Sequence, residues 1–216
     1  MKNRLYILLI LSNILLLACS SETTNSNTSS TTPIESKYKE EKQETKTEVI
    51  TPKKIPKPKP KKYKFTFTDL DNQKIDLSVE KNYYDFKNIT QPIVLMNFFA
   101  TWCPPCIGQI PHLNNIQKRY KGNLFIEGML VHDNITDQNL HRFIASQKIN
   151  FFISNNQEKN KNFSSFIAPK LRLTSDFSLP LMILFVNGKY YTHYEGSIPE
   201  EMIESDIKQA LKNIKR

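Results

Sequence analysis

Two cysteines separated by two prolines are the residues whose types and spacing point most directly to chemistry. Cys103, Pro104, Pro105 and Cys106 follow Trp102, directly after an apolar run and at the start of a stretch with helical periodicity. A cysteine at a helix N-terminus lies near unpaired backbone N–H groups and the positive end of the helix dipole, and both favour its thiolate. We therefore expect Cys103 to ionise readily and to act as a nucleophile.

The second cysteine lies within reach of the first, because a spacing of three residues is nearly one helical turn. Cys106 can therefore form a disulfide with Cys103 or separate from it as a dithiol. In disulfide exchange, the Cys103 thiolate attacks a partner disulfide, and Cys106 resolves the mixed disulfide that results. Pro104 and Pro105 suit the first helical turn, where a missing N–H removes no hydrogen bond. Trp102 is expected to shield the sulfurs and to offer an apolar surface to a substrate.

Two other roles for the cysteine pair remain open. A Cys-x-x-Cys motif is half of many zinc sites, but a complete site needs two more ligands. The sequence has no second such pair, and its histidines, His112, His132, His141 and His193, lack the spacing of metal ligands. A purely structural disulfide is the other role, but so small a loop adds little stability through chain entropy. We predict a redox pair, with no metal site and no cofactor.

The elements around this motif are predicted from apolar periodicity. Residues 93–100 form a continuous apolar run, typical of a strand that is buried on both faces. The remaining elements are predicted as a leading hairpin (65–77), a helix that follows the motif and ends at Gly122, strands at 124–131 and 150–154, a helix at 136–148, a final hairpin (181–195) and a C-terminal helix capped near Ser197, with Pro199 in its first turn. The polar stretch 155–178 yields no clear prediction.

Strand–helix–strand units imply a parallel core with right-handed crossovers and helices on both faces. Asn187-Gly188 predicts a hairpin turn, which adds an antiparallel pair. The predicted fold class is α/β, a central mixed sheet flanked by helices, with a hairpin added at its N-terminus. We assign this domain to residues 63–216, which carry 18 Lys and Arg against 15 Asp and Glu. The domain is thus only mildly basic, although the whole chain has a net charge of +9.

Residues 1–18 have the pattern of an export signal. Lys2 and Arg4 precede an apolar run that is shorter than the ~20 residues of a membrane-spanning helix. The run ends in Leu-Leu-Ala before Cys19, which resembles a bacterial lipobox. This resemblance implies cleavage before Cys19 and attachment of lipid to that residue. An ordinary signal peptide with an incidental cysteine, or an uncleaved anchor, is the alternative.

Residues 19–62 are expected to form a disordered linker behind the anchor. Of residues 20–62, 14 are Ser or Thr, ten are Lys and six are Glu, and none is Gly. Such a segment cannot bury enough apolar surface to offset its ordering entropy. Alternating Lys and Pro over 52–62 predict an extended spacer. We interpret it as a tether and not as a nucleic-acid site, because an exported chain rarely meets nucleic acid. Contact with anionic lipid is the remaining alternative.

The residues around the cysteine pair resemble the thioredoxin-like superfamily, and within it the TlpA/ResA branch of exported, membrane-tethered thiol-disulfide oxidoreductases. The resemblance covers about residues 64–214 and is carried by the segments 96–106, 109–113 and 179–180. It implies that Pro180 is cis and lies beside a redox-active disulfide between Cys103 and Cys106. The backbone of Leu179 is then free to bind an extended substrate segment.

The sequence departs from the family pattern at three positions. The buried Asp of thioredoxins proper is Asn97 here, and the Glu common in the TlpA/ResA branch is Gln109. Neither amide accepts a proton at neutral pH. Glu127, on the neighbouring predicted strand, is a candidate for the missing acid, but we expect it to be an exposed strand residue. Leu179 is bulkier than the small or hydroxylated residue usual before the cis-proline, which implies an altered choice of substrate.

The resemblance implies a monomeric, lipid-anchored reductant of oxidised proteins on the periplasmic side of the cell envelope. Its substrates would include the CxxCH cysteines of apocytochrome c, and its electrons would come from a membrane partner of the CcdA/DsbD type. A disulfide-forming oxidant is an alternative, but DsbA-type oxidants carry a large helical insertion, and residues 132–179 show one clear helical pattern. A copper-binding module that uses the thiols as soft ligands and a purely structural lipoprotein are further alternatives.

Overall fold

The computed structural model describes residues 60–215 of the 216-residue chain. The predicted export signal, Cys19 and the linker as far as residue 59 lie outside the described residues. In the described part, no helix combines the length and the apolarity that a membrane span requires. The first strand begins at Lys62, next to the boundary that the sequence predicts for the domain.

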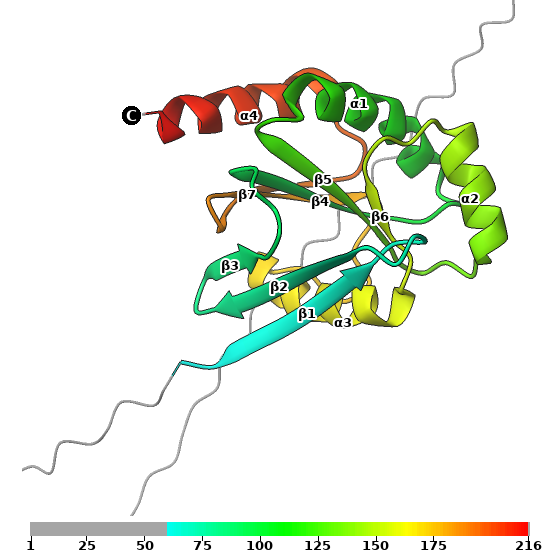
Figure 1. The fold of residues 1–216 in the computed structure, drawn as a ribbon, viewed down its shortest axis with the longest axis horizontal. Coiled ribbons are helices and arrows are strands. Elements are labelled where there is room, and N and C mark those ends of the chain that lie inside the picture. Colours follow the sequence, from blue (N-terminus) through cyan, green and yellow to red (C-terminus); the bar gives the residue numbers. More distant parts are fainter. Residues whose placement is uncertain (1–59, 216) are drawn as a thin grey trace, which may run out of the picture. The chain divides into compact units, whose positions relative to one another are not determined.

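An eight-stranded mixed sheet forms the centre of the domain (Figure 1). Its strands are β1 (Lys62–Thr68), β2 (Lys74–Glu80), β3 (Tyr83–Phe86), β4 (Ile93–Phe99), β5 (Leu124–Leu130), β6 (Phe152–Ser154), β7 (Leu181–Val186) and β8 (Lys189–Glu195). They are adjacent in the order β1-β2-β3-β8-β7-β4-β5-β6. Strands β4, β5 and β6 pair in parallel, and the other neighbours pair antiparallel. The predicted mixed sheet with an N-terminal hairpin is confirmed.

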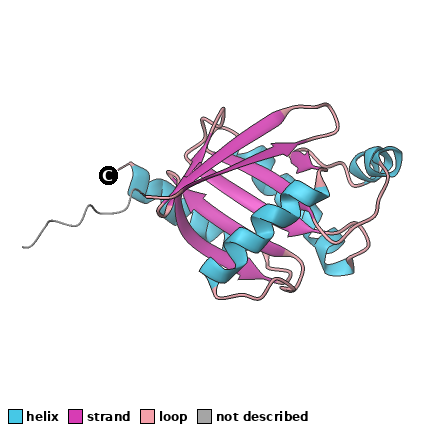
Figure 2. Cartoon of the chain, turned by 90° about the horizontal axis from the view of Figure 1, so that it is seen from below, coloured by secondary structure: helices cyan, strands magenta, loops and turns pink. Residues whose placement is uncertain are grey.

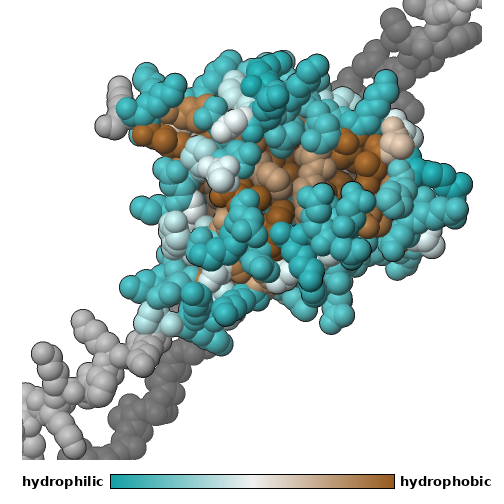
Figure 3. All heavy atoms as spheres, viewed as in Figure 1, coloured by the Kyte–Doolittle hydropathy of each residue, from teal (hydrophilic) through white to brown (hydrophobic). Residues whose placement is uncertain are grey.

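Helices cover both faces of this sheet (Figures 1 and 2). They are α1 (Pro104–Tyr120), α2 (Asp137–Ser146), α3 (Gln157–Ile167) and α4 (Glu200–Ile214), with a 3-10 turn at Ala168–Leu171. Helices α1 and α4 enclose an apolar cluster that includes Leu113 and Ile203. Helix α3 and the β1–β2 hairpin enclose a second cluster around Phe67 and Phe163. In Figure 3, hydrophobic residues are visible between the layer of α1 and α4 and the layer of α3 and the β1–β2 hairpin. The residues around them on this face are mostly hydrophilic.

Strand β4 lies inside the sheet and leads into the cysteine motif. It pairs with β5 on one side and with β7 on the other, and none of its residues is more than 4% exposed. The prediction of a strand covered on both faces is therefore confirmed. The chain leaves β4 at Phe99 and enters α1 at Pro104. This connection places Cys103 at the edge of the sheet where α1 begins.

Two elements are not predicted by the hydrophobic pattern. Strand β3 has only four residues, too few for a clear alternation. Helix α3 buries Phe163, but its inward face also carries Asn160. The side-chain Nδ2 of Asn160 donates to the carbonyl oxygens of Leu130 and Ser154, both at 2.9 Å. Because a satisfied amide replaces an apolar contact here, the helical pattern of 155–178 is weak.

Helix α4 begins later than the sequence predicts. Pro199 occupies its N-cap position, and Glu200 is its first residue. Proline needs no N–H at a helix start, so it suits this place as well as the first turn. Ser197 lies before the helix, and its hydroxyl donates to Gln109 on α1 at 3.1 Å. Ser197 was predicted to lie near the cap of α4, but it connects the segment before α4 to α1.

Glu204 links α4 to α1 in a way that makes stability depend on pH. It accepts hydrogen bonds from the Tyr120 hydroxyl at 2.8 Å and from Nη1 of Arg119 at 2.7 Å. These donors, Tyr120 first, lower the pKa of Glu204 from 4.5 to about 2. The stabilisation is therefore present above pH 4.5 and is lost as the pH falls through about 2.

We expect Glu204→Gln to lower the Tm at pH 7, in thermal unfolding followed by circular dichroism. The difference in Tm between this variant and the wild type should vanish near pH 2. Glu201→Gln, an exposed site on the same helix, is the control, and an equal loss in both variants would contradict the prediction.

Candidate active site

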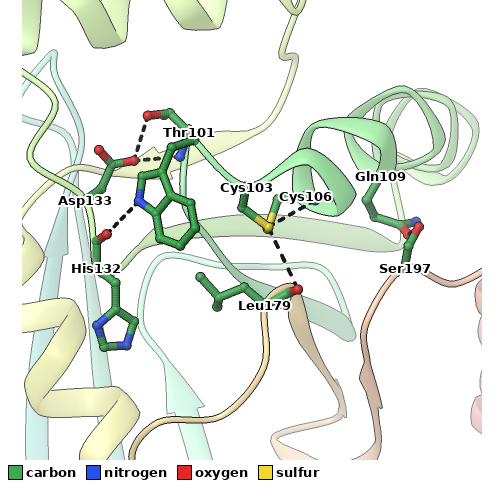
Figure 4. The surroundings of a disulfide bond; sticks show 9 residues. Thr101, Cys103, Cys106, Gln109, His132, Asp133, Leu179 and Ser197 are labelled. Carbon is green, nitrogen blue, oxygen red and sulfur yellow. Dashed lines mark hydrogen bonds between the residues drawn. A yellow bond between two sulfur atoms is a disulfide. The ribbon is translucent and has the colours of Figure 1, made fainter.

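The cysteine pair lies at the N-terminus of α1. Cys103 is the N-cap residue, and Pro104 and Pro105 are the first two residues of the helix. Cys103 and Cys106 form a disulfide, with their Cα atoms 5.2 Å apart (Figure 4). The backbone N–H of Cys106 donates to Sγ of Cys103 at 3.3 Å. Because proline has no N–H, this is the first backbone donor of the helix, and it points at the sulfur of Cys103.

The two cysteines differ in their access to solvent. Cys103 is 5% exposed and Cys106 is fully buried, whereas Trp102 beside them is 63% exposed. The indole Nε1 of Trp102 donates to the carbonyl oxygen of His132 at 2.8 Å, and Trp102 lines the same cleft as Cys103. A substrate sulfur can therefore approach Cys103 beside this ring, while Cys106 is shielded.

We expect alkylation of the reduced protein at pH 7 to occur at Cys103 and hardly at Cys106. Exposure and the helix N-terminus both favour reaction at Cys103, so its rate should be at least about tenfold higher. Mass spectrometry of peptides after treatment with iodoacetamide measures the two rates. The same reaction in urea is the control, because unfolding removes the difference in access. Equal labelling of both thiols in the folded protein would contradict the prediction.

The cis-proline lies directly opposite the nucleophile. The Leu179–Pro180 bond is cis, as the resemblance implies, and it precedes β7. The carbonyl oxygen of Leu179 lies 3.8 Å from Sγ of Cys103 (Figure 4). The fold therefore brings together Trp102, the cysteine pair, Leu179 and Pro180. A peptide that pairs with the backbone of Leu179 would carry its own sulfur close to Cys103.

A cleft of about 390 Å³ opens beside Cys103. Its lining consists of Trp102, Cys103, Pro104, Pro105, His132, Asp176, Phe177 and Leu179. Asp176 and Phe177 are not predicted as site residues from the sequence, although both lie within three residues of Leu179. No role is predicted for His132 either. The signal for His132 is its place directly after β5, because the carboxyl ends of parallel strands β4 and β5 meet at one edge of the sheet.

The loop after β5 is fastened to the cysteine motif by a carboxylate. Oδ2 of Asp133 accepts hydrogen bonds from the backbone N–H of Thr101 at 2.6 Å and from its hydroxyl at 2.7 Å. Oδ1 of Asp133 accepts from the N–H of Ile135 at 3.0 Å. These contacts hold the loop that carries His132, and with it the wall of the cleft, against the residue before Trp102.

The two amides at positions where the family resemblance implies acids are both buried. Asn97 is 1% exposed and Gln109 is fully buried. Oε1 of Gln109 accepts from the N–H of Ile198 at 2.8 Å and from the Ser197 hydroxyl at 3.1 Å. Neither amide can take a proton from Cys106. Among residues 60–215, no three His, Cys, Asp or Glu side chains are grouped so that they could hold a metal ion.

Glu127 is not an exposed strand residue, so that expectation is wrong. It is fully buried between Met96 of β4 and Phe152 of β6. Met96 belongs to the cluster under α3, and adjacent residues at the same register face the same side, so Glu127 faces away from α1. Burial raises the pKa of Glu127 well above its ordinary 4.5. The carboxyl therefore lies on the opposite face of the sheet from Cys106 and does not replace the missing acid.

Comparison with known proteins agrees with this geometry. Residues 61–211 match the model of the Redoxin family. The chain is similar to the thiol-disulfide oxidoreductase ResA of Halalkalibacterium halodurans, with 28% identity over 112 residues, which cover 51% of this chain and 58% of that protein. It is also similar to thioredoxin Y2, chloroplastic, of Arabidopsis thaliana, with 27% identity over 118 residues, which cover 55% and 51%. The chain thus spans about half the length of the curated relatives it matches.

A solved structure shows the same fold. The thiol:disulfide interchange protein, thioredoxin family protein, from Chlorobium tepidum TLS superimposes with a TM-score of 0.53 and 20% identity, covering 74% of this chain and 99% of that chain. At this identity the likeness concerns the fold, which is thioredoxin-like. The Redoxin match spans nearly all of the described domain, including the cysteine pair and Pro180. Together with the cysteine pair, that match supports an oxidoreductase, and the chain belongs to the Redoxin family.

Proposed function

We propose that this protein is a thiol-disulfide oxidoreductase that reduces disulfides of exported proteins. One observation carries the proposal: Sγ of Cys103 lies at the N-terminus of α1, 3.8 Å from the carbonyl oxygen before the cis-proline and beside an open cleft. This arrangement joins an activated sulfur to a backbone site for a polypeptide. The similarity to the ResA protein of Halalkalibacterium halodurans supports the same chemistry.

In the reducing direction, the reaction begins with Cys103 and Cys106 as free thiols. The Cys103 thiolate attacks one sulfur of the substrate disulfide, and the other substrate sulfur leaves and takes up a proton. Cys106 then attacks Sγ of Cys103, forms the disulfide seen in this structure and expels the second substrate sulfur, which receives the proton of Cys106. Two electrons thus pass from the dithiol to the substrate. A membrane electron donor of the CcdA/DsbD type would regenerate the dithiol.

The topology between β5 and β7 supports a reductant over a DsbA-type oxidant. This region contains two helices, α2 and α3, whereas the sequence shows one clear helical pattern there. Helix α2 is the crossover between the parallel strands β5 and β6, and α3 packs on the central sheet through Phe163. Neither helix belongs to a separate helical insertion. The additional helix therefore does not resemble the large helical insertion of DsbA-type oxidants.

The proposal places the domain outside the cytoplasm, tethered to a membrane through Cys19 and residues 20–62 as a monomer. The signal-like start and the lipobox resemblance support this part. The proposed substrates are oxidised exported proteins, including the CxxCH cysteines of apocytochrome c, and nucleic acid is not among the partners.

A Cys19→Ala variant, expressed in a bacterial host that lipidates exported proteins, is expected to leave the membrane fraction. Retention of this variant in that fraction would contradict the lipid anchor.

Two measurements test the activity itself. The protein is expected to catalyse the reduction of insulin by dithiothreitol, and its midpoint potential is expected to lie near that of thioredoxin, about −270 mV. A potential near about −120 mV would instead identify an oxidant. Absence of insulin reduction, together with stoichiometric binding of Cu(I) by the dithiol, would overturn the proposal in favour of a copper-binding module.

A further inference from the structure

The geometry for exchange depends on two segments that are far apart in the chain. Cys103 begins α1, whereas Leu179 and Pro180 lead into β7. The contact between Sγ of Cys103 and the oxygen of Leu179 joins residues 76 positions apart. A displacement of about 1 Å between reacting groups can lower a rate about 100-fold. The contacts that fix α1 relative to the start of β7 therefore matter for the reaction.

A short segment after β8, which we call the connecting segment (196–198), bridges these two elements. The N–H of Gly196 donates to the carbonyl oxygen of Pro180 at 2.8 Å. Two residues later, the N–H of Ile198 donates to Oε1 of Gln109 at 2.8 Å. One side-chain oxygen on α1 thus holds a segment whose other end is bonded to the cis-proline itself.

The chemistry of these partners determines how Gln109 is oriented. The N–H of Ile198 and the hydroxyl of Ser197, at 3.1 Å, both act as donors, so the carboxamide presents its oxygen to them. Gln109 is fully buried, and water does not compete for these bonds. Its side chain turns away from the disulfide and toward Ser197 (Figure 4). Gln109 therefore influences the sulfurs through the placement of neighbouring segments and not by direct contact.

We propose that Gln109 is a positioning residue for disulfide exchange, which holds the cis-Pro180 segment in register with Cys103 through the connecting segment. This inference rests on the proposed function, because it concerns the same cysteine pair. The positioning by Gln109 affects polypeptide substrates and small disulfides differently. A polypeptide must lie along Leu179 while its sulfur meets Cys103, whereas a small disulfide needs only Cys103. Loss of the Gln109 oxygen therefore impairs the reduction of polypeptides and spares the reduction of small disulfides.

The test compares two substitutions at Gln109 with two substrates, insulin and 2-hydroxyethyl disulfide. Methionine has a similar length but lacks a strong acceptor, whereas glutamate keeps an acceptor oxygen whether or not it is ionised. We expect Gln109→Met to lower kcat/KM for insulin at least about tenfold and to change kcat/KM for the small disulfide by less than about twofold. Gln109→Glu should retain the wild-type ratio of the two values. A glutamate variant that behaves like the methionine variant would overturn the proposal.

Gln117 provides a matched control on the same helix. Its Nε2 donates to the oxygen of Leu124 at 3.1 Å, and its Oε1 accepts from the N–H of Ile126 at 2.8 Å, so it joins α1 to β5. Gln117→Met should lower the Tm without changing the ratio of kcat/KM for the two substrates. If both methionine variants shift this ratio alike, or neither does, the proposal fails while reduction by the wild type still supports the proposed function. A wild type that reduces neither substrate overturns both.

Discussion

A Cys106→Ala variant is expected to accumulate as a mixed disulfide with its substrate, whereas a Cys103→Ala variant is expected to form no adduct and to lose its activity. The reason lies in their places on α1. Cys103 is the partly accessible N-cap residue opposite Leu179, and the buried Cys106 can reach only the sulfur of Cys103. Residues 60–215 contain no cysteine besides these two, so removal of Cys106 leaves the described part of the chain without a thiol to break the bond between Cys103 and the substrate. The two variants therefore differ in kind: the reaction of Cys103→Ala stops before the first covalent step, and that of Cys106→Ala stops after it.

The adduct can be measured with insulin in vitro and with exported proteins in the native host. Electrophoresis without reductant should show a new band for Cys106→Ala, and mass spectrometry should identify the linked cysteine as Cys103. Treatment with dithiothreitol should dissolve the band, and the double alanine variant should show none. Normal turnover in either single variant would be incompatible with the exchange mechanism. Adducts linked through Cys106 in the Cys103→Ala variant would show that the two roles are reversed.

The parts of the fold that the sequence predicts well are those with strong local patterns. The continuous apolar run at 93–100 is the buried strand β4, and the motif that follows it opens α1 as expected. Asn187-Gly188 joins β7 to β8 as a hairpin turn, with positive φ at both residues. Each of these features is specified by a few adjacent residues. Helix α3 is different, because its buried face is completed by the hydrogen bonds of Asn160, which depend on β5 and β6.

The candidate site likewise combines features that the sequence predicts with features that it does not predict. The cysteine pair and the role of its helix terminus follow from residue types and spacing, and the cis bond at Pro180 follows from the family resemblance. His132 is indicated only by its place directly after β5. Its contact with Trp102 and the role of the connecting segment could not be predicted, because both arise from contacts between segments distant in the chain. Gln109 was recognised only as a departure from the family. The proposed part of Gln109 in holding the cis-proline segment rests on the partners of its side-chain oxygen, neither of which lies within its own helix.

Glu127 shows why a charged residue in a strand pattern can be misplaced. A carboxyl in an alternating strand usually marks the solvent side, but β5 is covered on both faces and six of its seven residues are buried. The cluster on its side includes Met96 and Phe163. Among the described residues, neither carboxyl oxygen of Glu127 has a hydrogen-bond partner. An unpaired buried polar group costs about 1–3 kcal/mol, so this position should limit the stability of the domain.

We expect Glu127→Met to raise the free energy of unfolding by about 2 kcal/mol at pH 4, where the carboxyl is neutral in the folded state, because a side chain of similar length replaces the unpaired carboxyl. The gain should grow with pH. Burial raises the pKa of Glu127 above 4.5, so the folded state holds this proton more tightly than the unfolded state. Stability from this group is therefore greatest below pH 4.5 and falls as the pH rises toward the raised pKa, by at most about 1.4 kcal/mol per pH unit.

Glu127→Gln separates the two causes, because glutamine keeps the unpaired polar group but cannot ionise. Urea unfolding of the reduced protein between pH 4 and 8 should show that this variant loses the part of the pH dependence that comes from Glu127. It should remain less stable than Glu127→Met throughout. If Glu127→Met destabilises the protein at pH 7, the carboxyl has a partner that contributes to the native state. If the wild type and Glu127→Gln show the same pH dependence, the ionisation of Glu127 is not coupled to folding.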